Sequence, residues 1–428
     1  MPPHSSRHAG DGTDSAVLAG PLNHLVEQLW SPLVTTGSLR ITVGDTPLPE
    51  GWRVAEEYYV LPSVSRATML IPAGPRAATI GSLLNYRGLR RPLPNLQRSV
   101  LGNLVRTGVP LPFPRLRVAV PAIGAEPEEL PLAAFAARLE QPQAYAAIGV
   151  RTGANRKATL QLVDGAGAPI GFAKVAWDRA SAEGIRRETA ALAEASSSGP
   201  ARRPRLLASG EHVGWPFLIS EPLPADARGV RAEVPPPTPA EMIALTPVSR
   251  RAEVSATGQF RDLRMRLASL PDGDVVGPVR AAACRLLDAV AQCHDNLLVT
   301  TRCHGDLTPW NSARDRDGRL WCWDWESSEA DAVAGQDALH WHVTVQTEGG
   351  RALDGSVLRT ALDRSSPLLV AAGVPRRAWG QVAAVYCATL AERACDLASG
   401  AGGWEKDWVL PEQLLDLLST SALLLEPV

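Results

Sequence analysis

The residues HGDLTPWN, His304–Asn311, carry the most information in this 428-residue chain, and LWCWDWE, Leu320–Glu326, follows shortly after them. Asp306 and Asn311 lie five positions apart on a segment that predicts a tight loop. This spacing brings a carboxylate and an amide oxygen into one pocket. The pair therefore predicts a polar site on a loop.

A second carboxylate, Asp324, follows the loop. The turn sequence Arg314–Arg319 and the apolar run Leu320–Trp323 predict a short hairpin that ends at Asp324. The donors are hard oxygens with no thiolate or imidazole cluster among them, which favours Mg²⁺ over zinc or copper. Transfer of a phosphoryl group from ATP needs such a metal site beside a carboxylate that orients the acceptor hydroxyl.

These residues resemble the catalytic loop of the aminoglycoside phosphotransferase and choline kinase-like family, which has Asn five residues after the Asp of His-Gly-Asp. The later Asp-Trp-Glu resembles the metal-binding position of that family. The resemblance covers about residues 140–400 and implies a protein-kinase-like fold. It also implies Asp306 as the catalytic carboxylate, with Asn311 and Asp324 as the Mg²⁺ ligands.

Two further residues match structural positions of that family. Gly335–Leu339 is similar to its Gly-x-x-x-Asp-Leu region, so Asp337 is expected to brace the catalytic loop. His304 is expected to have a structural role for the same reason.

A lysine and a glutamate match the pair that orients the nucleotide phosphates in kinases. Lys174 ends a predicted strand, and Glu188 lies on the predicted apolar stripe of the following helix with Ile185 and Leu192. An inward carboxylate needs a cationic partner, which favours a Lys174–Glu188 pair. A surface lysine and a solvated glutamate are the alternative.

The remaining nucleotide-binding candidates lie on two loops. Gly149–Asn155, with Gly149 and Gly153, occupies the place of a phosphate-covering loop, although an ordinary hairpin turn is the alternative. Pro216–Leu223 resembles the hinge between kinase lobes. Backbone groups of Ser220, Glu221 and Leu223 would then meet the adenine edge; the alternative is a strand that ends at a Pro-rich loop.

The chain is predicted to be α+β, with a small antiparallel-sheet lobe and a larger, mainly helical lobe after a mixed α/β N-terminal region. The predicted parts are a disordered tail (1–14), an N-terminal region of unknown role (15–140), a small lobe (141–223) and a helical lobe (224–428). The pattern predicts strands at 144–150, 158–163, 170–175, 205–208 and 216–220, with a hairpin turn at Asp164–Gly167 between the second and third strands. It predicts helices at 15–29, 77–86, 96–105, 180–195, 279–294, 357–372, 377–398 and 411–425.

Composition narrows the class of protein. Apolar residues make up 45% of the chain and charged residues 21%, and 43 basic residues face 45 acidic ones. No basic patch indicates nucleic-acid binding, and no apolar run is long enough to cross a membrane. The N-terminus lacks the hydrophobic region of a secretory signal, and the six cysteines form no CxxC pair. A cytoplasmic protein is expected, of unknown oligomeric state.

The resemblance implies a small-molecule kinase that uses ATP, or GTP as the alternative, to phosphorylate a sugar, amino alcohol or aminoglycoside-like hydroxyl. A catalytically inactive nucleotide-binding scaffold on the same fold is the main rival. A protein kinase is disfavoured, because Gly305 stands where protein kinases usually carry Arg. The acidic residues Glu326, Glu329 and Asp331 are candidates for an acceptor cleft, with a solvated acidic loop as the alternative; Trp310 and Trp325 are candidates for substrate contact.

Overall fold

The structure is a computed structural model that describes residues 20–44, 46–86, 92–123, 130–150, 157–194, 199–229, 236–404 and 409–425. The predicted disordered tail and Gly153 lie outside these residues.

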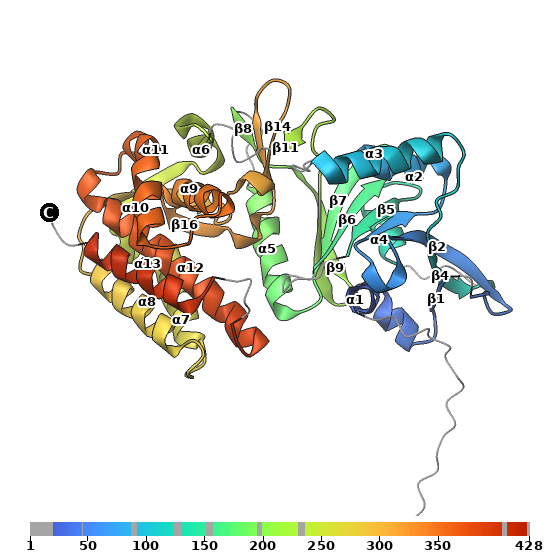
Figure 1. Ribbon diagram of the computed structural model, residues 1–428, viewed down its shortest axis with the longest axis horizontal. Helices are drawn as coiled ribbons and strands as arrows, with labels where there is room; N and C mark the ends of the chain where they lie inside the picture. Colours follow the sequence, from blue (N-terminus) through green and yellow to red (C-terminus); the bar gives the residue numbers. More distant parts are fainter. Residues whose placement is uncertain are drawn as a thin grey trace, which may run out of the picture. The chain divides into compact units, whose positions relative to one another are not determined.

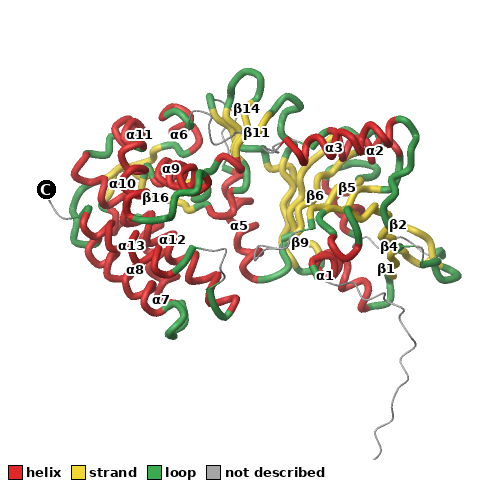
Figure 2. The backbone as a smooth tube through the Cα atoms, in the orientation of Figure 1, coloured by secondary structure: helices red, strands yellow, loops and turns green. Residues whose placement is uncertain are grey.

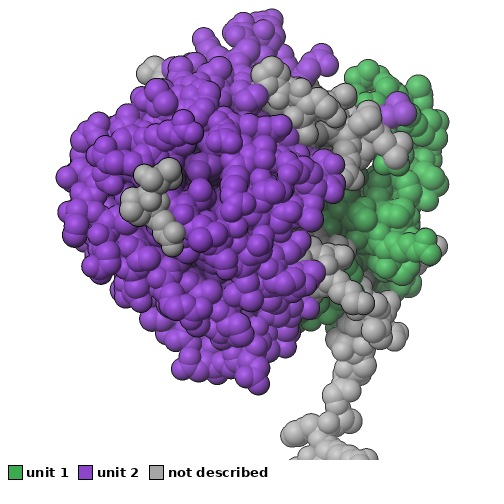
Figure 3. Space-filling model, turned by 60° about the vertical axis from the view of Figure 1, so that its left-hand side comes forward, with its two compact units in different colours: residues 1–85, 97–177, 210–217 green, residues 86–96, 178–209, 218–428 purple. Residues whose placement is uncertain are grey.

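The chain divides into two compact units, which Figure 3 colours separately. Unit 1 comprises residues 1–85, 97–177 and 210–217, and unit 2 comprises residues 86–96, 178–209 and 218–428. Unit 1 contains most of a large sheet, whereas unit 2 contains most of the helices (Figure 1, Figure 2). A sheet-rich part and a larger helical part agree with the predicted α+β class.

The large sheet has the strand order β1-β4-β2-β3-β5-β6-β7-β10-β9. The three runs predicted between residues 144 and 175 form an antiparallel meander, β5–β6–β7, around the predicted turn at Asp164–Gly167. The strands are β1 Arg40–Val43, β2 Trp52–Leu61, β3 Met69–Pro72, β4 Arg115–Pro121, β5 Tyr145–Gly149, β6 Ala158–Val163, β7 Pro169–Val175, β9 Leu206–His212 and β10 Trp215–Ser220.

The N-terminal region continues this sheet instead of interrupting it. β3 pairs antiparallel with β5, so Met69 faces Gly149 and Leu70 faces Ile148 across the predicted boundary near residue 140. The helices here are α1 Pro21–Thr35, α2 Arg76–Leu84, α3 Pro92–Arg106 and α4 Pro131–Arg138. The helix predicted at 15–29 lies six residues further toward the C-terminus, as α1. The sequence did not predict α4.

Unit 2 is built around α8, α12 and α13, which pack against one another and lie side by side in Figure 1. The helix predicted at 357–372 is wrong as one element: it is divided at Ser365, because Pro367 in the first turn of the next helix lacks a backbone N–H. The helices are α5 Arg179–Ala193, α6 Pro239–Leu245, α7 Gly258–Ser269, α8 Gly277–Val290, α9 Gln336–Glu348, α10 Gly355–Arg364, α11 Ser366–Ala371, α12 Trp379–Ala401 and α13 Pro411–Leu423.

Two small sheets of unit 2 hold the loop that contains Asp306. One has the order β12-β13-β16 and the other β11-β14-β15-β8. The loop leaves β13 at Cys303 and enters the β14–β15 hairpin at Ser312, which pairs with Cys322 as the turn sequence predicts. The strands are β8 Ala201–Arg202, β11 Arg228–Gly229, β12 Val248–Ala252, β13 Leu297–Cys303, β14 Ser312–Arg314, β15 Leu320–Cys322 and β16 Glu329–Val333.

Among the described residues, none of the helices combines the length and the apolar character that a membrane crossing requires.

Candidate active site

Asp337 anchors the start of the loop, as predicted. The backbone N–H groups of His304 and Gly305 donate to its two carboxylate oxygens, each at 2.8 Å. Asp337 is buried in the first turn of α9. Gly305 has a φ of +77°, and a Cβ there would lie 2.2 Å from the backbone oxygen of Ser327. Only glycine fits this close approach, because any side chain would collide with the Ser327 backbone.

His304 joins the loop to the strand that precedes Asp324. Its Nδ1 accepts from the Asp306 N–H at 3.2 Å, and its Nε2 lies 3.1 Å from the Trp323 carbonyl, so Nε2 carries the proton. Burial lowers the pKa of His304, against the opposing effect of Asp337, Asp306 and Asp324. A neutral, buried imidazole has the predicted structural role.

The structure brings Asp306 and Asn311 together. Asn311 Nδ2 donates to Asp306 Oδ2 at 2.8 Å and to the Asp306 carbonyl at 3.1 Å. The amide oxygen of Asn311, Oδ1, is not used in these two hydrogen bonds. The Trp323 N–H donates to the Asn311 carbonyl at 3.1 Å. Asp324 therefore follows directly on a residue that is bonded to the loop.

Asp324 has a backbone conformation that non-glycine residues rarely adopt, with a φ of 69° and a ψ of 57°. Such strain persists where the surroundings enforce it, and it is frequent at functional sites. Among the described residues no three His, Cys, Asp or Glu side chains cluster as a metal site. Asn311 and Asp324 carry oxygen donors of the kind that Mg²⁺ prefers, and a metal held by both stays a prediction.

His340 is a neighbour of Asp306 that sequence reasoning missed. Its Nε2 lies 3.0 Å from Asp306 Oδ1, and its Nδ1 lies 3.2 Å from the Tyr386 hydroxyl. The signal was available, because His340 is three residues after Asp337 on α9 and residues at this spacing share a helix face.

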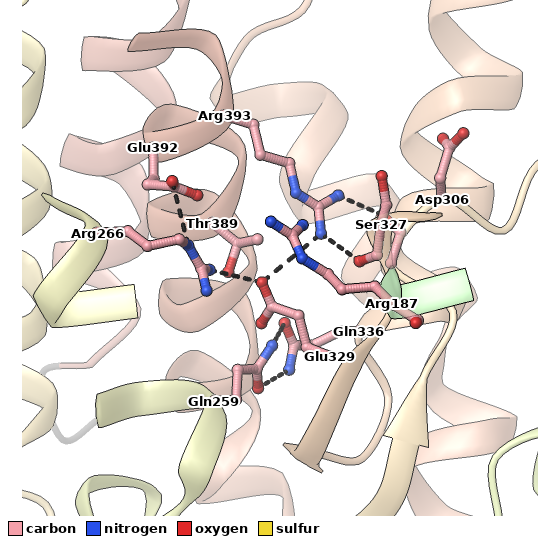
Figure 4. Close-up of polar contacts among 12 residues, drawn as sticks. Arg187, Gln259, Arg266, Asp306, Ser327, Glu329, Gln336, Thr389, Glu392 and Arg393 are labelled. Atoms are coloured by element: carbon pink, nitrogen blue, oxygen red, sulfur yellow. Dashed lines mark hydrogen bonds and ion pairs between the residues drawn. The ribbon is translucent and has the colours of Figure 1, made fainter. Parts of the chain in front are cut away.

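Arg393 on α12 binds the backbone of the loop. Its guanidinium donates to the carbonyls of Gly305 at 2.6 Å and Ser327 at 2.8 Å (Figure 4). It thereby connects the backbone on both sides of the candidate site, one residue before Asp306 and three residues after Asp324.

Two of the acidic residues proposed for the acceptor cleft contact arginine side chains. Glu329 is 7% exposed and contacts Arg266 at 2.6 Å. Asp331 contacts Arg250 at 2.7 Å and accepts from the Gly258 N–H. The solvated-loop interpretation is wrong for Glu329, because its carboxylate is buried against Arg266. Asp331 is partly exposed beside Arg250, so its place in an acceptor cleft stays a prediction.

The two candidate tryptophans differ in exposure. Trp325 is fully buried between the His304 ring, at 4.4 Å, and the Arg203 guanidinium, at 4.1 Å. A substrate contact by Trp325 is therefore wrong. Trp310 is 40% exposed and remains a candidate.

The two members of the predicted lysine–glutamate pair lie in different units. Lys174 is buried on β7 of unit 1. Glu188 is buried on α5 of unit 2, on the predicted stripe with Ile185 and Leu192. The stripe is confirmed, and the pairing stays a prediction. Lys157, which precedes β6, is also buried and was not considered from the sequence.

The other nucleotide-binding candidates lie at strand ends. Gly149 ends β5, and Ser220 ends β10. The Glu221 N–H donates to the Arg205 carbonyl at 2.9 Å, and the Glu221 carboxylate contacts the Arg205 side chain at 2.8 Å. This N–H is therefore used within the protein, which leaves the carbonyl of Glu221 for the predicted adenine contact. The predicted contacts of Ser220 and Leu223 stay predictions.

Comparisons with known proteins identify kinases at low similarity. No protein-family model and no curated protein matches the chain. Among solved structures, LicA in complex with AMP is 12% identical, with a TM-score of 0.40 over 68% of this chain and 96% of that chain. Choline kinase LicA from Streptococcus pneumoniae is 12% identical, with a TM-score of 0.37 over 63% and 89%. Amicoumacin kinase hAmiN in complex with AMP-PNP, Ca²⁺ and Ami is 10% identical, with a TM-score of 0.36 over 63% and 85%. These TM-scores are too low to support an inference about function.

Proposed function

We propose that the protein is a small-molecule kinase that transfers the γ-phosphoryl group of ATP to a hydroxyl. The observation that supports this most is the contact between Asp306 and Asn311. Asp324 follows Trp323, whose N–H donates to the Asn311 carbonyl and whose carbonyl lies 3.1 Å from Nε2 of His304. A catalytic carboxylate beside two oxygen donors is the arrangement that phosphoryl transfer requires.

In this proposal the acceptor oxygen attacks the γ-phosphorus, and the bond from that phosphorus to the β–γ bridging oxygen breaks. Asp306 orients the hydroxyl and accepts its proton, and ADP leaves with the bond electrons. Asp306 suits this role because its side chain is 34% exposed, while Asn311 and His340 hold its two oxygens. Mg²⁺ held by Asn311 Oδ1 and Asp324 would neutralise phosphate charge.

Several finer assignments belong to the same proposal. Lys174, oriented by Glu188, would hold the phosphates, with Lys157 as a second candidate; both lysines are buried in the sheet-rich unit. Gly149, Gly153, Ser220, Glu221 and Leu223 would surround the nucleotide, with ATP or GTP as donor. The acceptor would be a small hydroxyl compound and not a nucleic acid. A cytoplasmic location is supported by six free cysteines, which persist in a reducing compartment.

The test is a screen of sugars, amino alcohols and aminoglycosides with labelled ATP and Mg²⁺, comparing the wild type with Asp306→Asn. We expect turnover, or slow ATP hydrolysis where no acceptor is found, to fall at least about 100-fold in Asp306→Asn. Nucleotide binding should be retained, as a thermal shift with MgATP would show. Equal turnover in the two proteins would refute the assignment, and binding without any turnover would favour the inactive scaffold.

A further inference from the structure

The Asp306 carboxylate is held by two donors from different elements of unit 2. Asn311, in the short turn that ends the loop, donates to Asp306 Oδ2 at 2.8 Å. His340, on α9, lies 3.0 Å from Asp306 Oδ1. A carboxylate on a loop can otherwise rotate about its Cβ–Cγ bond. One donor on each oxygen fixes the plane of the group and therefore the direction of its remaining lone pairs.

A third residue contacts the other ring nitrogen of His340. The Tyr386 hydroxyl on α12 lies 3.2 Å from Nδ1 and is buried, with burial raising the pKa of the phenol. The Asp306 carboxylate can only accept, so the imidazole carries its hydrogen on Nε2, the nitrogen that faces Asp306. The Tyr386 hydroxyl is placed to donate to Nδ1, which favours this tautomer.

We propose that His340 and Tyr386 are positioning residues of the phosphotransfer reaction, which hold Asp306 in the orientation that meets the acceptor hydroxyl. This inference rests on the proposed function and goes beyond it, since it assigns a role to two residues outside the His-Gly-Asp loop. His340 donates to Asp306 and does not take up the acceptor's proton, because its Nε2 is already protonated.

The test compares two substitutions that fill the same space. Gln at position 340 keeps an N–H donor as many bonds from Cβ as Nε2 of histidine, whereas Leu has none. In His340→Leu we expect kcat for MgATP consumption to fall about tenfold to a hundredfold with KM for MgATP unchanged, because the carboxylate is misaligned while nucleotide binding is untouched. His340→Gln should recover most of the lost rate.

A matched control and a second variant complete the test. His342 lies on the same helix but next to Arg364, so His342→Gln should leave kcat unchanged. Tyr386→Phe keeps the bulk of the ring and removes only the hydroxyl, and it should lower kcat a few-fold even if His340→Leu fails to fold.

The outcomes separate this inference from the proposed function. If wild type and Asp306→Asn consume ATP equally, the proposed function fails and this inference with it. If Asp306→Asn is inactive while His340→Leu and Tyr386→Phe match the wild type, only the positioning role is refuted. Equal losses in His340→Gln and His340→Leu would also refute it, because the donor would then be irrelevant.

Discussion

Two carboxylates of unit 2, one on strand β16 and one on the loop after β13, have opposite surroundings. Glu329 begins β16 opposite Cys303, and Asp306 follows three residues after Cys303. Glu329 is buried against Arg266 and lies 3.8 Å from Arg393 (Figure 4), whereas Asp306 is partly exposed between Asn311 and His340. A buried carboxylate bound by arginines has a structural role. A carboxylate that is oriented by hydrogen bonds and reached by solvent is available to a substrate.

The largest effect on stability is expected from Arg266→Met. Arg266 contacts Glu329 at 2.6 Å and Glu392 at 3.1 Å, and burial already raises the pKa of Glu392. Removing the arginine leaves two buried carboxylates without this partner, so we expect a loss of roughly 3 kcal/mol in the free energy of unfolding. Urea denaturation measures it. If the free energy of unfolding is unchanged, the ion pair of Glu329 with Arg266 does not stabilise the fold, and the contrast with Asp306 fails.

Asp337→Asn should lower both stability and catalytic rate, since Asp337 is a buried carboxylate that binds the backbone of the catalytic loop. One of the N–H groups of His304 and Gly305 would face the NH₂ group of Asn and lose its acceptor. We expect a loss of about 2 kcal/mol in stability and a lower kcat, because the loop shifts. Denaturation measures the stability, and steady-state kinetics measures kcat. An unchanged kcat would show that the hydrogen bonds of Asp337 are not needed for catalysis.

The pH dependence of stability tests His342, a half-buried group that carries no charge at neutral pH. Burial and Arg364 lower the pKa of His342 to about 4, below the ordinary value near 6.5. The unfolded chain therefore binds a proton first, and stability is lost as pH falls from about 6.5 toward 4. His342→Gln should reduce this loss by about 1 kcal/mol between pH 7 and pH 5, as water still reaches part of the ring. Thermal melts at the two pH values would show it, and an identical loss would contradict it.

The smallest effect is expected at an exposed pair on α5. Glu183 contacts Arg187 at 2.6 Å, but its side chain is 56% exposed. Glu183→Gln should change the free energy of unfolding by less than about 0.5 kcal/mol. It serves as the exposed control for Arg266→Met, and a loss as large as that of Arg266→Met would show that burial is not what distinguishes the two sites.

Local patterns predicted much of the fold and the loop. The alternation and turn around Asp164–Gly167 predicted β5–β7, and the buried stripe of α5 followed from the spacing of Ile185, Glu188 and Leu192. The bracing role of Asp337 followed from the family resemblance and is seen in its two backbone hydrogen bonds.

Contacts between distant parts of the chain could not be predicted from the sequence. Nothing local to Met69 or Gly149 shows that their strands pair and that the N-terminal region extends the sheet. The arginine partners of Glu329 and Asp331 come from distant segments, so these acids resembled an exposed acidic loop. His340 touches Asp306 across 34 positions, and only the helix spacing from Asp337 hinted at it.

The most direct measurement is an experimental structure of the protein with AMP-PNP and Mg²⁺. The account predicts Mg²⁺ bound to Asn311 Oδ1 and the Asp324 carboxylate at about 2.1 Å, with the Asp306 carboxylate turned toward the γ-phosphate. Nucleotide and metal bound away from these three side chains would contradict it.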